Sequence, residues 1–188
     1  MKTKLFLVMI ASMLIFTSKG QTDTTIMGSQ KPFKITISKN YPIMVDYNQS
    51  LREMVDAGKY NWVVDDINTC NFPINGRGKI NLNVVLITFK KVVGEKDSIN
   101  IKDVLMVIDS AGFRQATLPE LLALGKSFPN LQSDVSIFAL GSSYKPSYAD
   151  SRAPRLGEDS RGRLIHLCAF DFFTRSWNGS YGFLAVHK

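Results

Sequence analysis

The longest apolar pattern in the chain lies at residues 79–93, KINLNVVLITFKKVV. Its first half alternates Ile80, Leu82 and Val84 with polar residues, and apolar residues then follow one another directly. Alternation with a period of two is typical of a strand with one buried face, and a short apolar run is typical of a strand buried on both faces. We therefore predict that this segment is the principal strand. The same alternation predicts a shorter strand at residues 33–38.

Three other segments carry helical patterns. One has apolar residues at the spacing i, i+3, i+4 and i+7, namely Ile101, Val104, Leu105 and Ile108. The other two begin with Ser or Thr followed three residues later by Glu, as in Ser50 with Glu53 and Thr117 with Glu120. This is the capping box, in which side chains satisfy free amides at a helix N-terminus. We predict helices after Ser50, at 101–111 and at 118–126, and we interpret Glu120 as a cap rather than a catalytic group.

The last third of the chain has the pattern of strands separated by turns. Residues 135–143 predict a short strand, 164–173 a strongly apolar strand and 181–188 a terminal strand. Residues 142–163 contain few aliphatic residues and many turn formers, so we predict an exposed loop region with a short strand at Pro154–Leu156.

Helices in the middle of the chain and strands grouped at its end indicate the α+β class. We predict one domain over residues 32–188, in which two or three helices pack on an antiparallel sheet. The sheet is built largely from the C-terminal strands and residues 79–93.

The first 20 residues have the pattern of a secretory signal peptide. Lys2 and Lys4 precede the apolar run at residues 5–17, and Ser18 and Gly20 are small residues at the −3 and −1 positions of a cleavage site. The run is shorter than the roughly 20 residues that span a bilayer. We predict export to the periplasm or the medium, with no integral membrane segment after cleavage. The alternative is an uncleaved N-terminal anchor.

The charge of the chain is modest once this leader is set aside. The full chain carries +7, and the leader contributes three lysines and no acidic residue, which leaves +4. No run of five basic residues occurs, so we predict no nucleic-acid partner. Residues 21–31 are polar, and we predict that they form a flexible linker.

The two cysteines leave two alternatives open. In an oxidising compartment Cys70 and Cys168 could form one disulfide across a long loop. Both also have large apolar neighbours, so they could be free thiols packed as small apolar side chains. Spacing in the sequence does not decide, because bridging depends on geometry.

Few residues fit catalytic or cofactor chemistry. The chain has only two histidines, His166 and His187, and no phosphate-binding or dinucleotide-binding glycine motif, so we predict neither a metal site nor a cofactor. Ser142 follows a glycine at a strand end, and Asp171 lies near His166 in the sequence. These three residues make a secreted hydrolase the alternative function, although the pattern of a nucleophile elbow is missing.

Arginine and aromatic residues gather in the last third of the chain. This residue mix is favoured at recognition surfaces because it combines large contact areas with directed hydrogen bonds. The candidate ligand-binding residues are Arg152, Arg155, Arg163, Trp177 and Tyr181. The alternative is a solvated basic loop whose aromatic residues fold onto the core.

Three segments, GFRQATLPELLALGKSFPNLQ, IFALGSS and the closing W…GFLAVHK, resemble a family of uncharacterised bacterial proteins. That family has a Thr-Leu-x-Glu-Leu-Leu helix and a C-terminal Phe-Leu-Ala-Val motif, and the resemblance covers roughly residues 43–188. It implies a domain type and assigns no catalytic residue. At the level of fold, two helices before a β-rich half, followed by a tryptophan-bearing turn and a last strand, are similar to C-type-lectin-like domains.

These observations favour an exported, non-catalytic module that binds a small ligand or a protein partner through its C-terminal loops. The other expectations are the hydrolase and a structural accessory protein of the cell envelope.

Overall fold

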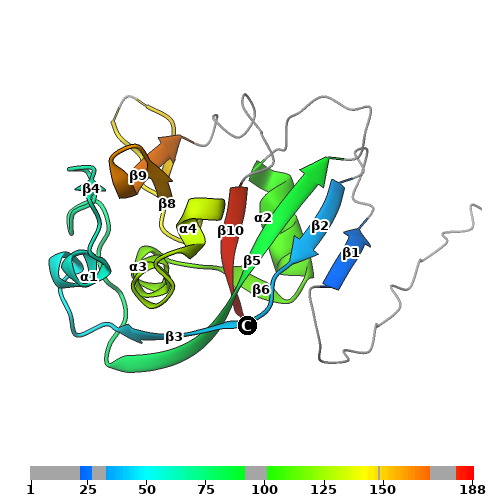
Figure 1. Ribbon diagram of the computed structural model, residues 1–188, viewed down its shortest axis with the longest axis horizontal. Coiled ribbons are helices and arrows are strands. Elements are labelled where there is room, and N and C mark those ends of the chain that lie inside the picture. The colour runs from blue at the N-terminus through cyan, green and yellow to red at the C-terminus, as the bar shows by residue number, and fades with distance from the viewer. Residues whose placement is uncertain (1–21, 27–32, 92–100, 148, 170–180) are drawn as a thin grey trace, which may run out of the picture.

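Strand β5 (Lys79–Lys91) is the longest strand of the sheet and coincides with the longest apolar pattern. On one side it pairs antiparallel with β10 (Tyr181–His187). On its other side it pairs with β3 (Tyr41–Asp46) along its first half and with β2 (Phe33–Ile37) along its second half. The prediction of a principal strand at residues 79–93 is confirmed. The computed structural model describes residues 22–26, 33–91, 101–147, 149–169 and 181–188 (Figure 1).

The sheet extends from β5 in both directions, in the order β1-β2-β5-β10-β7-β8-β9-β4, and β6 also pairs with β10. The remaining strands are β1 (Thr22–Ile26), β4 (Trp62–Val63), β6 (Phe113–Gln115), β7 (Ser136–Phe138), β8 (Arg152–Asp159) and β9 (Gly162–Ala169). Most pairs are antiparallel, but β7 with β10 and β4 with β9 are parallel. The α+β class is therefore confirmed, whereas the purely antiparallel sheet is corrected to a mixed one.

Four helices lie within the described residues: α1 (Leu51–Gly58), α2 (Ile101–Ser110), α3 (Leu118–Ser127) and the short α4 (Leu131–Asp134). The three predicted helices are α1, α2 and α3. Both predicted caps hold their glutamate: the Ser50 amide donates to Glu53 Oε2 at 2.7 Å, and the Thr117 amide donates to Glu120 Oε2 at 2.7 Å. The reciprocal bond forms at Ser50, whose Oγ accepts the Glu53 amide at 3.3 Å, whereas Thr117 Oγ1 is buried without a hydrogen bond among the described residues. Residue types at the helix starts were therefore sufficient to locate α1 and α3.

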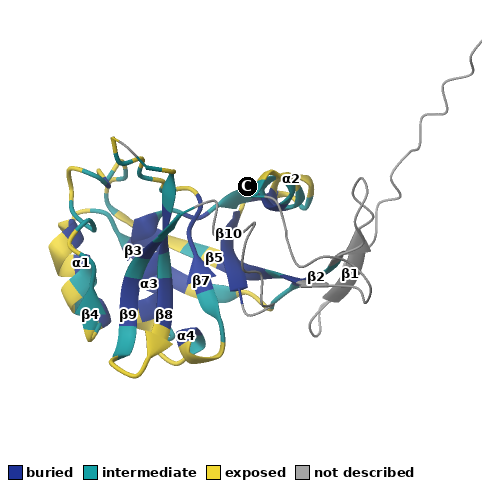
Figure 2. Ribbon diagram, turned by 90° about the horizontal axis from the view of Figure 1, so that it is seen from above, coloured by how far each residue is buried: buried dark blue, intermediate teal, exposed yellow. Residues whose placement is uncertain are grey.

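The helices cover the sheet from both sides, which produces two apolar clusters. On one face, Leu121, Leu122 and Leu124 of α3 pack with strand residues such as Ile165. On the other face, the cluster joins α2 to strand residues of β5 and β10, including Val104, Ile108, Ile87 and Phe183. Exposed residues concentrate on the outer sides of α1 and α2 and at the β8–β9 turn (Figure 2). Burial of each large apolar side chain in these two clusters contributes about 1.5–3 kcal/mol to stability.

Two sequence predictions are corrected by the strands. The predicted loop at residues 142–163 contains β8 and the start of β9, which pair from Arg152 with Ala169 to Asp159 with Gly162. The predicted short strand at Pro154–Leu156 lies inside β8, but the loop prediction missed the rest of this strand, including the buried Gly157. In the predicted linker 21–31, residues 22–26 form β1, which pairs antiparallel with β2.

Candidate ligand-binding face

A row of paired residues crosses the sheet and changes from apolar to cationic along its length. Phe183 of β10 pairs with Phe138 of β7, Phe138 pairs with Arg155 of β8, and Arg155 pairs with His166 of β9. The two phenylalanines are fully buried in the cluster that contains α2. Arg155 and His166 are half-buried. One face of the sheet is therefore buried core at β10 and β7 and a polar, half-exposed surface at β8 and β9.

The side chain of Arg155 has a donor atom without an acceptor among the described residues. Its Nε atom is buried and makes no hydrogen bond, and no carboxylate of the described residues forms an ion pair with it. The carboxylate of Asp159 feels the charge of Arg155 but is held by Arg161, whose Nη2 lies 2.7 Å from Asp159 Oδ2. Buried donors usually find an acceptor, because leaving one unsatisfied costs roughly 1–3 kcal/mol. Arg155 is therefore suited to an acceptor from outside the chain.

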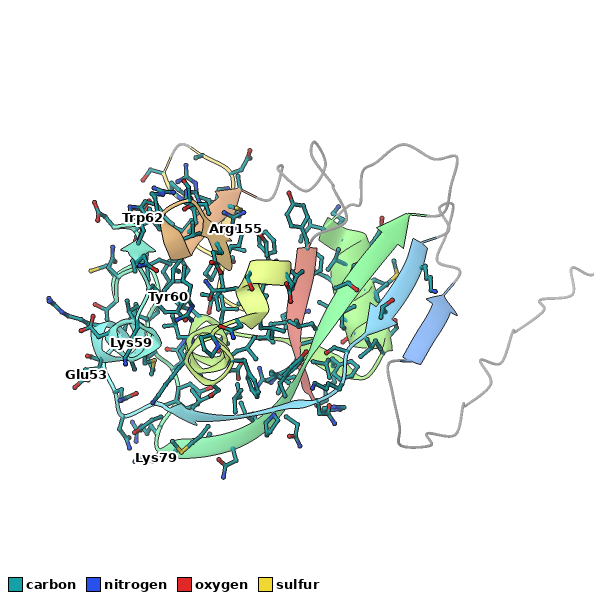
Figure 3. The ribbon with its side chains drawn as sticks, in the orientation of Figure 1. Glu53, Lys59, Tyr60, Trp62, Lys79 and Arg155 are labelled. Carbon is teal, nitrogen blue, oxygen red and sulfur yellow. The ribbon has the colours of Figure 1, made fainter. Side chains whose placement is uncertain are left out.

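His166 is held beside Arg155 by a stack of rings and cations. Its imidazole stacks on Trp62 of β4, with ring centroids 5.5 Å apart and an interplanar angle of 26°. The guanidinium of Arg161 lies over the same indole at 4.7 Å from the ring centroid. The His166 Nδ1 atom is also buried without a hydrogen bond. Figure 3 shows Trp62 and Arg155 on neighbouring parts of this face.

The electrostatics of this face favour the neutral form of His166. Burial lowers the pKa of the imidazole, and the positive charges of Arg155, Arg152 and Arg161 lower it further. The phenol of Tyr181 belongs to the same neighbourhood: burial raises its pKa, and the charge of Arg155 opposes that rise. An anion placed here would meet cationic and neutral donors.

The structure brings some of the predicted ligand-binding residues together and separates others. Arg155 and Tyr181 share this face. Arg152 lies at the start of β8 and pairs with Asp66, with Nη1 3.8 Å from Oδ2. Trp177 lies outside the described residues. We name Trp62, Arg155, Arg161 and His166 the arginine-histidine face.

Arg163 points to the opposite face of the sheet. Its Nη1 donates to the Gly58 carbonyl oxygen at 2.6 Å, and its Nη2 donates to the Gly125 carbonyl oxygen at 2.6 Å. These carbonyl groups belong to the last turns of α1 and α3. The guanidinium is thus engaged by helix ends, away from Arg155.

The proposed hydrolase residues do not form a pair. Ser142 Oγ accepts a hydrogen bond of 2.8 Å from the Leu118 amide at the start of α3. α3 packs on the face of Ile165, whereas neighbouring positions of a strand, such as His166, point to the other face. Asp171 lies outside the described residues. Within the described ranges, Ser142 is a helix cap with no basic partner.

The two cysteines are free thiols, so the disulfide alternative is not realised in this structure. Cys70 is exposed in the segment after β4, and Cys168 is half-buried in β9. Burial raises the pKa of the Cys168 thiol. The free-thiol alternative describes Cys168 better than Cys70, since only Cys168 contacts a core cluster.

We expect the native full chain, purified without reductant, to show one fast and one slow thiol in a titration with a disulfide reagent. Cys70 should react fast because it is exposed, and Cys168 should react slowly because burial disfavours its thiolate. Unfolding in urea should make both fast. An absence of reactive thiols before and after unfolding would show that the two residues are bridged.

The sequence patterns did not indicate Trp62 or Arg161 as part of this face. Trp62 belongs to a strand of two residues that pairs parallel with Leu164 and Ile165, and no periodicity marks so short a strand. Arg161 lies in the turn between β8 and β9, so its position depends on a hairpin within a segment that was predicted to be loop apart from Pro154–Leu156. The arginine-rich composition was the available signal.

Other kinds of site receive no support from the described part of the chain. No three His, Cys, Asp or Glu side chains among these residues converge as metal ligands. Nor is any helix there both long enough and apolar enough to cross a bilayer. Comparisons of the chain with protein-family models, curated proteins and solved structures found no match.

Proposed function

We propose that the protein is an exported, non-catalytic binding module that recognises an anionic group through the arginine-histidine face. The single observation that carries this proposal is Arg155, whose buried Nε has no acceptor and whose charge has no carboxylate partner among the described residues. A guanidinium recognises carboxylate, sulfate and phosphate oxygens with directed, charge-assisted hydrogen bonds.

The neighbours of Arg155 support recognition rather than catalysis. The stack of Arg161, Trp62 and His166 holds the imidazole in one orientation, which lowers the entropic cost of binding. Among the described residues, no serine or cysteine side chain makes a hydrogen bond with that imidazole, and Ser142 serves the start of α3. Ligand orientation, rather than bond cleavage, is the role that these side chains fit.

The wider expectations from the sequence stay predictions. Export depends on the leader pattern of residues 1–20. A C-type-lectin-like arrangement is in keeping with α2 and α3 preceding a strand-rich half. Membership of the uncharacterised bacterial family would add no residue roles.

We expect sulfate to bind the full chain with a dissociation constant on the order of millimolar, as suits one guanidinium and one imidazole. Arg155→Gln should weaken binding at least about tenfold, because a hydrogen bond to a charged group is worth about 1.5–3 kcal/mol. Affinity should rise as the pH falls through the lowered pKa of His166, since the protonated imidazole adds a positive charge. Sulfate is the suitable probe because it does not itself titrate near neutral pH.

Calorimetry and the NMR signals of the His166 ring, recorded against chloride at constant ionic strength, measure these effects. Arg52→Gln is the matched control, since it removes the same charge from α1, where the Arg52 side chain is 91% exposed. His166→Gln should abolish the pH dependence and leave weak binding. Equal sulfate affinity in Arg155→Gln and Arg52→Gln would refute the proposed recognition role of this face.

A further inference from the structure

Strand β3 has one hydrogen-bonding edge turned away from the sheet. In the antiparallel pair with β5, the Tyr47 amide donates to the Gly78 carbonyl oxygen at 2.8 Å just beyond the strand ends. Hydrogen-bonded pairs alternate along such a ladder, so Val45 and Ile43 also direct their backbone groups toward β5. Pro42, Met44 and Asp46 therefore direct theirs away from it.

This outer edge is unpaired at its centre. Among the described residues, nothing bonds to the amide or the carbonyl oxygen of Met44, and β5 is the sole strand that pairs with β3. Pro42 has no amide to donate, which is why proline is tolerated on an edge strand. The Asp46 carbonyl oxygen accepts the Gln49 amide at 3.2 Å and ends the open stretch. A short row of backbone groups is left available.

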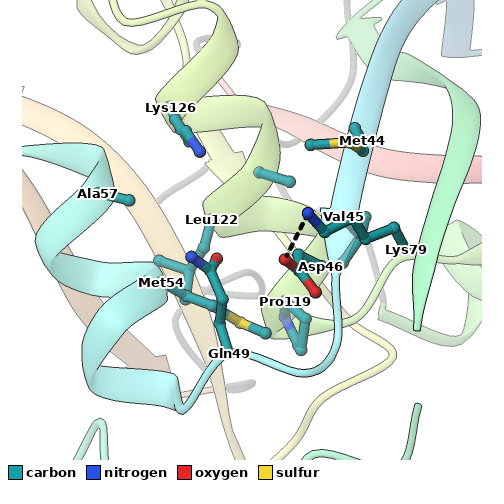
Figure 4. A pocket seen from close by; sticks show the side chains of 11 residues that line it. Met44, Val45, Asp46, Gln49, Met54, Ala57, Lys79, Pro119, Leu122 and Lys126 are labelled. Carbon is teal, nitrogen blue, oxygen red and sulfur yellow. Dashed lines mark ion pairs between the residues drawn. The ribbon is translucent and has the colours of Figure 1, made fainter. Parts of the chain in front are cut away.

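A pocket of about 180 Å³ lies between this edge and helices α1 and α3 (Figure 4). Its apolar part is formed by Met44 of β3, Met54 and Ala57 of α1, and Leu122 of α3. A cavity of about 150 Å³ holds one benzene ring, so this volume fits a single leucine, methionine or phenylalanine side chain. Met44 is 49% exposed, so its side chain is accessible to a bound segment.

The rim of the pocket carries an excess of positive charge. Lys79 is partly neutralised by Asp46, with Nζ 3.5 Å from Oδ2, as Figure 4 shows. Lys126 of α3 also lines the pocket and forms no ion pair with any carboxylate of the described residues. An occupant with an acidic side chain close to its apolar side chain would complement this rim.

We propose that an extended peptide segment of a partner protein adds to the outer edge of β3, with an apolar side chain in the pocket and an acidic side chain toward Lys126. Main-chain hydrogen bonds to Met44 provide affinity, and the pocket provides selectivity, as in other modules that bind a strand beside a helix. Because alternate residues of a strand share one face about 7 Å apart, the apolar and acidic residues lie two positions apart. This site is separate from the arginine-histidine face.

A random octapeptide library displayed on phage and selected against the full chain tests the proposal. We expect enriched peptides to share Leu, Met or Phe two positions from Asp or Glu. Synthetic peptides of that consensus should bind at least tenfold more weakly to Met44→Pro, which removes the outward amide that β5 does not use. Met44→Thr keeps the amide and alters only the side chain that lines the pocket, so it should weaken binding by less than Met44→Pro does. Ala57→Phe fills the pocket and should weaken binding at least tenfold.

A second readout does not depend on whether Met44→Pro folds. N-methylation of alternate peptide amides should abolish binding, and methylation of the amides between them should have little effect, since only one set faces β3. The proposal is overturned by a library without the shared pattern, by consensus peptides that bind Met44→Pro as they bind the unaltered chain, or by peptides insensitive to N-methylation. Loss of peptide binding in Arg155→Gln would assign the peptides to the other face and equally contradict it.

Discussion

Replacing Arg163 with alanine is expected to lower the free energy of unfolding by about 3 kcal/mol. The guanidinium joins the ends of two helices, because it donates to the carbonyl oxygens of Gly58 in α1 and Gly125 in α3. Hydrogen bonds from a charged donor contribute about 1.5–3 kcal/mol each, and a cation at a helix C-terminus also favours the helix dipole. The expected loss is smaller than the sum of these contributions, because water can bind the two carbonyl groups in the alanine variant.

Tyr60 makes Arg163 difficult to replace with another cation. The Tyr60 ring lies under the guanidinium, and the Arg163 Cζ atom is 4.9 Å from the ring centroid. Burial raises the pKa of the Tyr60 hydroxyl, which stays neutral. Its hydroxyl also occupies the space beside two glycines, since a Cβ at Gly58 or Gly125 would lie within 3 Å of the phenol oxygen. Lysine lacks the planar fork that reaches both carbonyl groups, so Arg163→Lys should recover only part of the loss.

Urea unfolding followed by circular dichroism measures this effect, with Arg52→Ala as the control for removal of an exposed arginine from α1. Arg52→Ala should leave the transition almost unchanged. If Arg163→Ala were as stable as the unaltered chain and bound sulfate more weakly, Arg163 would act in recognition, as its position among the arginines of the sequence first indicated. The expected result is a less stable protein with sulfate binding retained.

The different roles of Arg155 and Arg163 could not be predicted from the sequence. Composition identified Arg155 and Arg163 as one group, but their roles depend on which face of the hairpin each occupies. Arg155 pairs with His166 and lies on one face, whereas Arg163 reaches helix ends on the other. A shift of register by one residue would exchange these faces. The pairing of β8 with β9 had to be known first, and turn-forming residues concealed all of β8 except Pro154–Leu156.

The parts of the fold that followed from sequence are those set by local rules. Period-two alternation located β5, and the capping boxes located α1 and α3, because neighbouring residues decide both features. The parallel pairing of β4 with β9 joins segments about a hundred residues apart, and no local pattern records it. The stack that orients His166 depends on this pairing through Trp62, which is why the candidate site was only partly predictable.

The buried environment of Glu120 is a second case in which local sequence revealed one role of several. The carboxylate is 1% exposed and accepts the Thr117 amide of the predicted cap. It also accepts two hydrogen bonds from Arg114, at 3.0 Å and 2.6 Å, and one of 3.2 Å from the Tyr47 hydroxyl. These bonds tie α3 to β6 and to the turn after β3. The hydrogen bond to Glu120 in turn raises the pKa of the Arg114 guanidinium.

Glu120→Ala is therefore expected to destabilise the protein by about 3 kcal/mol, because removing one partner of a buried ion pair costs roughly 3–5 kcal/mol. The lower end of this range of costs applies because the Arg114 side chain is 41% exposed and is hydrated in the variant. Glu120→Gln should also be destabilising, since its amide group would face the donors of Arg114 or Thr117. Glu53→Ala is the matched control, as it removes the corresponding glutamate from the cap of α1, where it is exposed. Urea unfolding decides: equal losses in Glu120→Ala and Glu53→Ala would mean that Glu120 acts only as a cap, and that its bonds to Arg114 and Tyr47 contribute nothing to stability.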